Sequence, residues 1–316
     1  MQSTEIAGCF ATPRADSAGR WLPLAPFAAA LVVAASKPFG RDSVNTEAPI
    51  PRALLTRLAA YLPDRLPLTE REIDAMRMLQ SETHTIRRGN NIVVQGRNYS
   101  GIYVLGDGFA LRYKVLSDGK RQVFHVALPG DLIGYPACFF EHALYSATAL
   151  TEVTAFLVKF DDLTEIFRSQ PRVAMALFWA GAGETAMYGE HLAAVGRRGA
   201  LERVAHFILE MSIRLRAIGI GDGLRFGMPL TQEHIADVVG LSAPHVNRML
   251  RRLREERLID ITESQIQLLD RASLAALADF DDLYLARRSE IQSVATPVSD
   301  LFDGIGSKHG VRPLRV

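Results

Sequence analysis

Hydrophobic and polar residues alternate between residues 83 and 159, which is the period of a half-buried β-strand. Glycines and an Asp-Gly pair divide this region into short runs, a spacing typical of a β-sandwich, roll or barrel. Asp118-Gly119 predicts a hairpin turn with positive φ at both central positions. The flanking strands are expected to carry apolar faces made of Phe109, Leu111, Tyr113 and Val115, and of Phe124, Val126 and Leu128.

The pattern becomes helical from about residue 161 to residue 218. Alternating spacings of four and three residues, as in a coiled-coil seam, connect Val173, Leu177, Ala180, Glu184, Met187, His191 and Ala194. Four glycines interrupt this stretch, Gly181, Gly183, Gly189 and Gly196. Each costs a helix interior about 1 kcal/mol relative to alanine. Two alternatives stay open: a helix of ordinary packing, whole or broken in two, or a marginal dimer helix. Upstream, Thr69 and Glu72 form a capping box that predicts a helix start.

The stretch "LTQEHIADVVGLSAPHVNRMLRRLREERLI" (Leu230–Ile259) predicts two helices joined by a short turn. Thr231 can cap the first helix, and Gly240 can end it in the left-handed conformation. Ser242 can cap the second helix, with Pro244 in its first turn. The helical spacing buries Ile235, Val238 and Val239 in the first helix and Val246, Met249, Leu250 and Leu253 in the second. This is the pattern of a helix-turn-helix.

Charge decides between a DNA reader and a helical hairpin with a solvated basic face. The net charge is only +1 and the isoelectric point about 7.9, so any nucleic-acid surface must be local. Residues 242–257 hold five arginines against two glutamates, and the second helix turns His245, Asn247, Arg248, Arg251 and Arg252 outward. The segment Leu258–Asp270 then predicts two short strands, which complete a winged helix and favour the DNA reader.

The length of 316 residues suggests two domains plus extensions. Cys9 and Cys138 are the only cysteines, too few for a four-thiolate metal site. The apolar segment Trp21–Phe39 resembles a signal-peptide core, but its uninterrupted run, Phe27–Ser36, is too short to span a bilayer. We expect residues 1–50 and 281–316 to be disordered extensions.

The helix-turn-helix, the segment Gly101–Gly134 and the helical region between them together resemble the Crp/Fnr superfamily of bacterial transcription regulators, over about Leu54 to Leu277. The resemblance implies an α+β fold: a β-roll sensor domain (51–170), a dimerisation helix (171–198) and a winged helix-turn-helix domain (199–280). It also implies a cytoplasmic homodimer that binds double-stranded DNA, and RNA polymerase too if it is an activator. No stable membrane association and no enzymatic activity are expected.

The resemblance also implies which residues touch DNA. Base contacts fall on Pro244, Asn247 and Arg248, and phosphate contacts are assigned to Thr231, Ser242, His245, Arg251 and Arg252. Arginine can bind guanine with two hydrogen bonds, and asparagine can bind adenine. Pro244 departs from the glutamate that founding members carry and cannot accept a hydrogen bond from cytosine. The operator should therefore differ at that base.

The sensor region lacks the residues of nucleotide-binding members. Tyr135 and Tyr145 stand where those members carry the glutamate for the ribose and the arginine for the cyclic phosphate, so cyclic AMP binding in the usual mode is not expected. The cluster cysteines of the oxygen-sensing branch are missing, and no cofactor is predicted. Haem stays open, because His125, Cys138 and His142 lie in or near the roll. The predicted pocket for an unidentified effector consists of Tyr135, Cys138, Tyr145 and Tyr188.

Two other function classes remain as alternatives. One is a small-molecule receptor with an output other than DNA binding, which the intact helix-turn-helix argues against. The other is a membrane-tethered regulator that uses Trp21–Phe39. An enzyme is least favoured, because the sequence shows no phosphate-binding glycine loop, catalytic-triad signature or H-E-x-x-H motif.

Overall fold

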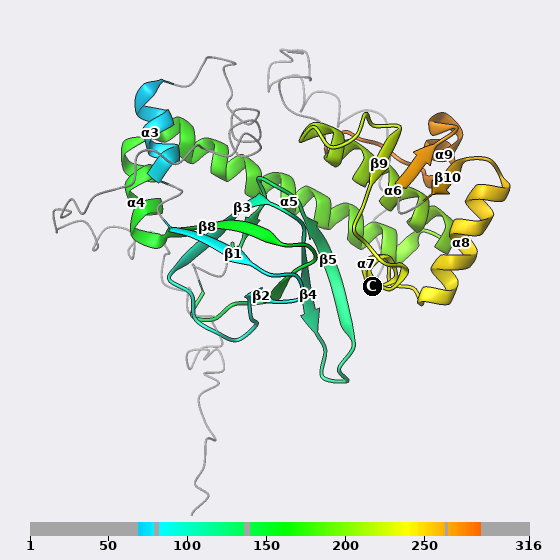
Figure 1. Ribbon diagram of the computed structural model, residues 1–316, viewed down its shortest axis with the longest axis horizontal. Helices are drawn as coiled ribbons and strands as arrows, with labels where there is room; N and C mark the ends of the chain where they lie inside the picture. Colours follow the sequence, from blue (N-terminus) through cyan, green and yellow to red (C-terminus); the bar gives the residue numbers. More distant parts are fainter. Residues whose placement is uncertain (1–68, 79–81, 136–139, 263–264, 286–316) are drawn as a thin grey trace, which may run out of the picture. The chain divides into compact units, whose positions relative to one another are not determined.

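The computed structural model describes residues 69–78, 82–135, 140–262 and 265–285 (Figure 1). The predicted extension 1–50, with Trp21–Phe39, lies outside these residues, as do Cys138 and most of the predicted tail. No helix in the described ranges is both long enough and apolar enough to cross a membrane. Helix α3 (Glu70–Met78) starts at the predicted capping box, where the Thr69 amide donates to Glu72 over 2.7 Å.

Eight strands form the predicted β-roll: β1 (Glu82–Ile86), β2 (Asn91–Val93), β3 (Gly101–Asp107), β4 (Ala110–Val115), β5 (Arg121–Ala127), β6 (Leu132–Ile133), β7 (Ser146–Ala149) and β8 (Val153–Lys159). They pair antiparallel in two four-stranded sheets, in the orders β1-β8-β3-β6 and β2-β7-β4-β5. Small and branched side chains from both sheets, among them Val93, Leu105, Ala127 and Val153, pack into a common core. Alanine is the most frequent residue in this core, and the period-two prediction is confirmed.

Two details of the β4–β5 hairpin differ from the prediction. Gly119 has the positive φ of +81°, but Asp118 does not, and the Leu116 amide donates to the Lys120 carbonyl over 2.8 Å. The turn therefore has three residues with a left-handed glycine, in place of the predicted two-residue turn. The ladder also shifts between Arg112 and Tyr113, where a β-bulge leaves Phe124 as the extra residue.

The bulge moves Phe124 to the other face of β5. Phe124 packs into the roll interior, whereas Val126 and Leu128 belong to the core shared with the C-terminal helices. The prediction that these three residues share one face was wrong. A single inserted residue reverses the alternation, because side chains on a strand point to opposite faces in turn.

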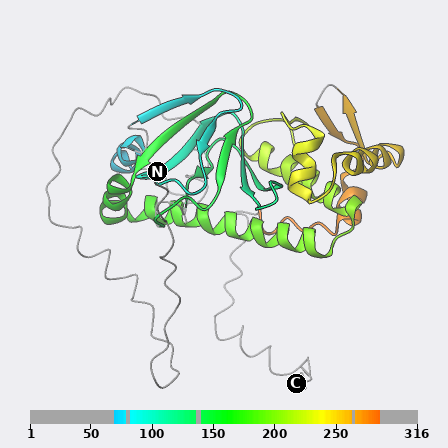
Figure 2. The ribbon, with the colours of Figure 1, turned by 90° about the horizontal axis from the view of Figure 1, so that it is seen from below.

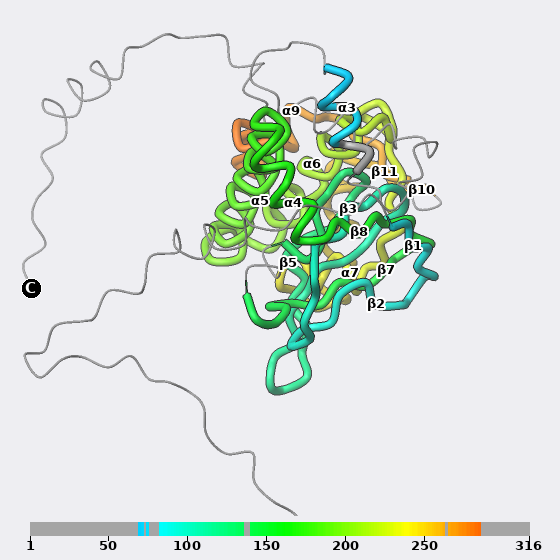
Figure 3. Tube along the Cα trace, turned by 90° about the vertical axis from the view of Figure 1, so that its left-hand side faces the viewer, coloured from blue at the N-terminus to red at the C-terminus, as the bar shows by residue number. Residues whose placement is uncertain are grey.

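Helix α4 (Phe160–Ser169) leads into α5 (Pro171–Arg197), which runs unbroken for 27 residues through all four glycines (Figure 2). Most of the predicted seam is buried inside the same chain. Val173, Leu177 and Ala180 pack against sheet residues such as Val104 and Phe156. Helix α3 also lies beside the N-terminal end of α5 (Figures 1 and 3). An ion pair between Arg172 and Glu72 joins the two helices.

The C-terminal elements are α6 (Ala200–Ala217), β9 (Arg225–Gly227), α7 (Gln232–Val239), α8 (Ala243–Glu255), β10 (Ile259–Thr262), β11 (Gln265–Leu268) and α9 (Arg271–Ala278). The predicted strand pair is present as β10 and β11, with Ile261 opposite Ile266. Strand β9, which the sequence analysis did not predict, adds a third member in the order β10-β11-β9. The helices share a core in which α6 supplies Val204, Ile208 and Leu215. A winged helix-turn-helix results.

Candidate functional site

The turn between α7 and α8 has the geometry that its residues predict. The Thr231 hydroxyl accepts from the His234 amide over 3.2 Å, and the His234 ring accepts in return from the Thr231 amide. Gly240 ends α7 with φ of +67°. Ser242 is at the N-cap of α8 with an extended backbone, but its hydroxyl makes no capping hydrogen bond in the described structure. That hydroxyl is therefore available for a contact outside the chain.

Helix α8 turns one apolar face inward and one polar face outward. Val246, Leu250 and Leu253 are buried against the other helices. Pro244, Asn247, Arg248 and Arg251 are exposed, at the i, i+3, i+4 and i+7 positions of one helix face. The structure thus places the predicted base-contact residues together. Of the predicted phosphate contacts, Thr231 and Ser242 are exposed at the helix N-termini, and His245 is half-buried.

The arginines on α8 differ in their surroundings. Arg252 is held by Glu256, one turn later, with 2.7 Å between Nε and Oε1. Within the described residues, Arg248 and Arg251 make no side-chain hydrogen bond or ion pair. Asn247 donates from its amide nitrogen to Gln232 Oε1 over 3.0 Å, which ties α8 to the first turn of α7. Gln232 could not be identified from the sequence, because nothing local marks it as a partner of a residue 15 positions away.

A second contact missed from the sequence joins the roll to α7. The Arg121 guanidinium on β5 forms an ion pair with the Asp237 carboxylate, with its Nε 2.8 Å from Oδ2, and lies over the Tyr113 ring. The side-chain amide of the adjacent Gln122 donates to the backbone carbonyl of Asp237 over 2.7 Å. The first helix of the helix-turn-helix is therefore bonded to the β4–β5 hairpin.

Of the residues predicted to form the effector pocket, Tyr145 is buried and Tyr135 and Tyr188 are half-buried, whereas Cys138 lies outside the described residues. The Tyr145 hydroxyl is buried, accepts from the Gly134 amide over 2.8 Å and donates to the Tyr135 carbonyl over 3.0 Å. The Tyr188 hydroxyl donates to Glu184 over 3.4 Å. Burial raises the pKa of both tyrosines, so both hydroxyls stay protonated donors. The buried group that these tyrosines face is the Arg112 guanidinium, which the sequence analysis did not single out.

A buried polar network continues from the roll to α6. His125 Nε2 lies 3.2 Å from Asp131 Oδ2 and 3.2 Å from Arg214 Nη2. Arg214 also bonds Asp131 and Glu210, and His191 Nε2 lies 2.7 Å from Glu210 Oε2. Burial, reinforced by the charge of Arg214, lowers the pKa of His125 to about 4, so its imidazole is neutral at neutral pH.

Nearby charges outweigh burial in setting the pKa values of His191 and Glu210. Burial would lower the pKa of His191, but the Glu210 carboxylate outweighs it and raises that pKa. Burial likewise opposes ionisation of Glu210, yet the charges of His191 and Arg214 hold its pKa well below the usual range. The network thus contains paired charges at the junction of β5, α5 and α6.

The network also includes the one group of metal-ligand type that the described residues bring together. One ligand atom from each of His125, Asp131 and Glu184 lies within 4.8 Å of the others, and all three residues are buried. The guanidinium groups of Arg112 and Arg214 already neutralise these carboxylates, at 2.8 Å and 3.2 Å. A metal ion would have to displace both arginines, so the donor set does not favour a metal site. Of the other two haem-ligand candidates, His142 is exposed and Cys138 lies outside the described residues.

Comparison with known proteins identifies both halves of the fold. A cyclic nucleotide-binding domain matches residues 83–170, and a Crp-like helix-turn-helix domain matches residues 202–277. The nitrogen fixation regulation protein FixK of Rhizobium meliloti is 30% identical over 196 residues, which cover 62% of this chain and 86% of that protein. FixK of Azorhizobium caulinodans is 31% identical over 191 residues, which cover 60% of this chain and 76% of that protein. The solved structure of FixK2 from Bradyrhizobium japonicum superimposes with a TM-score of 0.56 at 29% identity, over 62% of this chain and 96% of that one.

Proposed function

Because the chain belongs to the Crp/Fnr family of DNA-binding transcription regulators, we propose that it acts as a homodimer whose two α8 helices read a palindromic operator in successive major grooves. The observation that carries this proposal is the exposed face of α8. That face presents Pro244, Asn247 and Arg248 together in the first half of the helix. In a helix-turn-helix, residues in this part of the second helix reach the base edges.

Each residue on that face has a distinct proposed role. Arg248 donates two hydrogen bonds to guanine, and Asn247 binds adenine, since its second amide hydrogen and its carbonyl oxygen remain available beside the bond to Gln232. Pro244 offers only an apolar surface. We therefore expect the operator to lack, at the position that Pro244 faces, the cytosine that a glutamate would read.

Phosphate contacts surround these base contacts. Thr231 and Ser242 lie at helix N-termini, where free amides and hydroxyls favour an anion. Arg251 lies one turn beyond Arg248, and Arg252 and His245 flank the base-reading face on α8. These contacts set affinity and salt dependence but carry no sequence information.

A second seam on α5 is the proposed dimer contact. It also follows spacings of three and four, and every member is exposed: Met175, Phe178, Ala182, Thr185, Gly189, Leu192 and Gly196. Phe178 is 63% exposed and Leu192 76%. The small residues of this seam allow a second helix to approach closely, which gives a reason for Gly189 and Gly196 in a helix that glycine destabilises. The partner that fits this second seam is a second copy of α5. The first seam, which was predicted from the sequence, mostly faces the chain's own roll and helices instead.

We assign a sensor role to the roll (51–170), dimerisation to 171–198 and DNA binding to 199–280. Cyclic AMP in the usual mode does not fit, because Tyr135 and Tyr145 stand in place of the glutamate and the arginine that hold the nucleotide. The cation beside Tyr145, Arg112, is already paired with Glu184 and is not available to a phosphate. We place the protein in the cytoplasm, without a catalytic role, and with RNA polymerase as a further partner if it activates transcription.

The test is selection of random-sequence DNA by the purified full-length protein, with and without a small-molecule filtrate of cell extract. The proposal expects an enriched palindrome whose half-site centres are about one helical turn apart. The variant Arg248→Ala serves as the control and should enrich no defined sequence. Enrichment of nothing by the wild type under either condition would contradict DNA reading and favour a receptor with another output.

A further inference from the structure

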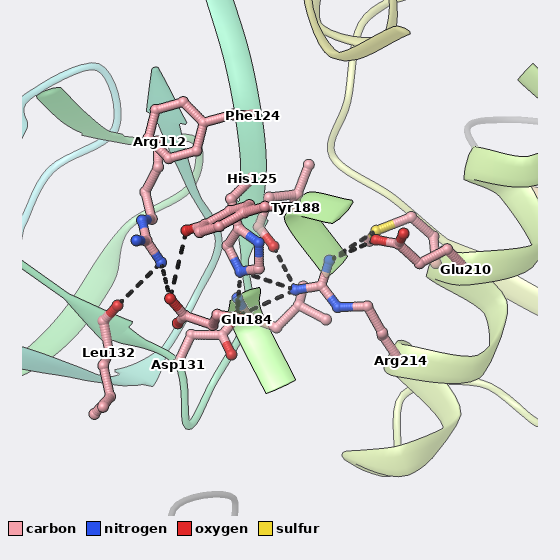
Figure 4. Close-up of polar contacts among 12 residues, drawn as sticks. Arg112, Phe124, His125, Asp131, Leu132, Glu184, Tyr188, Glu210 and Arg214 are labelled. Atoms are coloured by element: carbon pink, nitrogen blue, oxygen red, sulfur yellow. Dashed lines mark hydrogen bonds and ion pairs between the residues drawn. The ribbon is translucent and has the colours of Figure 1, made fainter. Parts of the chain in front are cut away.

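Among the described residues, Arg112 is the largest side chain that is almost completely buried, with 1% of its surface exposed. It points from β4 into the roll, where Nη1 donates to Glu184 Oε2 over 2.8 Å and to the Leu132 carbonyl over 3.3 Å. Nη2 donates to the Tyr135 carbonyl over 3.4 Å. The guanidinium carbon lies 4.7 Å from the ring centre of Tyr145, and the rings of Phe124 and Tyr188 stand 5.7 and 5.9 Å away (Figure 4).

This arrangement is how a protein holds a planar cationic ligand. A carboxylate supplies the opposite charge, carbonyls accept the edge hydrogens, and aromatic rings attract the cation through their faces. Burial alone would lower the pKa of Arg112, but Glu184 and the tyrosines outweigh it and the net pKa is raised. The guanidinium therefore stays charged inside the roll.

We propose that Arg112 is a ligand built into the chain: its guanidinium occupies the roll's effector site, so that operator binding needs no diffusible effector. The inference rests on the proposed function as a DNA-binding regulator. It assigns the site to a cation, the reverse of the phosphate that nucleotide-binding members accommodate. An incoming anion would have to displace Arg112 and would then face the Glu184 carboxylate.

The same cation is placed to couple the roll to the DNA-binding helices. Glu184 belongs to α5, so the pair fixes β4 against that helix. Arg112 is also opposite His125 in the β4–β5 ladder, and His125 bonds Arg214 of α6. Contacts therefore run without a gap from the guanidinium to the first helix of the DNA-binding domain. A continuous network supports coupling, and only a measured change in DNA affinity establishes it.

The first experiment uses the wild-type protein. The protein is stripped of small molecules by denaturation on a column, refolding and dialysis, and its affinity for the selected operator is compared with that of untreated protein. The proposal expects the two affinities to agree, and the extract filtrate to change neither. Loss of binding on stripping, with recovery on addition of the filtrate, would overturn the inference. No enrichment of DNA by either preparation would instead reject the proposed function itself.

The second experiment removes the tethered ligand and supplies it in solution. Arg112→Ala should weaken operator binding by about 5- to 150-fold, the usual range of coupling between two sites. Millimolar methylguanidinium should restore that binding saturably, whereas the same concentration of potassium chloride should not. The matched control is Arg87→Ala, which removes an exposed arginine of the roll. Neither methylguanidinium nor potassium chloride should change the operator binding of this variant. Circular dichroism at the assay temperature separates loss of coupling from loss of fold.

A second variant keeps the test decisive if Arg112→Ala does not fold. Glu184→Gln keeps the shape of the side chain but leaves the guanidinium without its counter-charge. It should also weaken operator binding while the far-ultraviolet spectrum stays unchanged, and methylguanidinium should not restore it. Either folded variant binding the operator like the wild type would overturn the inference, as would a folded Arg112→Ala that methylguanidinium leaves unchanged.

Discussion

Replacing Arg248 and Arg251 separately tests the division of α8 into base-reading and phosphate-binding positions. Both arginines are exposed and make no side-chain hydrogen bond or ion pair within the described structure, so neither substitution breaks a visible internal contact. A two-hydrogen-bond contact to guanine contributes about 1–3 kcal/mol, and a dimer makes it twice. Arg248→Ala should therefore cost about 2–6 kcal/mol on the operator, which is roughly 30- to 10⁴-fold in affinity.

Arg251→Ala should change a different quantity. Loss of one phosphate contact in each protomer should reduce the slope of log affinity against log salt by about 1.8, equally for operator and unrelated DNA. Arg252→Ala is the matched control and should have a smaller effect, because Glu256 already neutralises Arg252 in part. Fluorescence anisotropy with both DNAs, across a salt series, gives the specificity ratio and the slope. An Arg248→Ala variant that keeps the wild-type specificity ratio would refute the assignment.

Three further predictions concern dimerisation, pH and the turn. Leu192→Glu should weaken the dimer roughly 100-fold or more, because the two leucines of a dimer lose about 3 kcal/mol of burial free energy. Analytical ultracentrifugation measures this loss, and Leu224→Glu, at another exposed leucine, is the control that should leave the dimer intact. Burial lowers the pKa of His125 to about 4 from 6.5, so the unfolded chain binds this proton first as pH falls. The native state should therefore lose about 2 kcal/mol between pH 7.5 and 5, and His125→Gln should flatten that slope in thermal unfolding; equal slopes would contradict it. Gly240→Ala, with φ of +67°, should lower the free energy of unfolding by about 1–2 kcal/mol in urea titrations, and no loss would mean that the turn relaxes.

The helix-turn-helix could be predicted because its determinants are local. The cap at Thr231, the left-handed Gly240 and the buried Val246, Leu250 and Leu253 act within one or two turns of each other. The sequence therefore specified both helices and their outward faces. It did not reveal the bond between Asn247 and Gln232, which depends on how the two helices cross.

The roll interior could not be predicted, because its determinants are distant in the chain. Arg112 stands in an alternating strand where a charged residue ordinarily faces water, and its partner Glu184 is 72 residues later. The bulge that turns Phe124 inward leaves no mark in the local sequence. Helix α5 carries two stripes of the same period, so spacing alone could not decide which one faces the roll. The stripe that begins at Val173 packs on the sheet, and the stripe from Met175 to Gly196 stays exposed.

The most direct test of DNA reading by α8 is a change of operator preference. Pro244 is exposed in the first turn of α8, where a glutamate is well tolerated. Repeating the DNA selection with Pro244→Glu should introduce cytosine at one symmetric position in each half-site, because a carboxylate accepts from the cytosine amino group. All other positions should stay as in the wild type. An unchanged operator, or a change spread over many positions, would contradict the claim that this helix reads the bases.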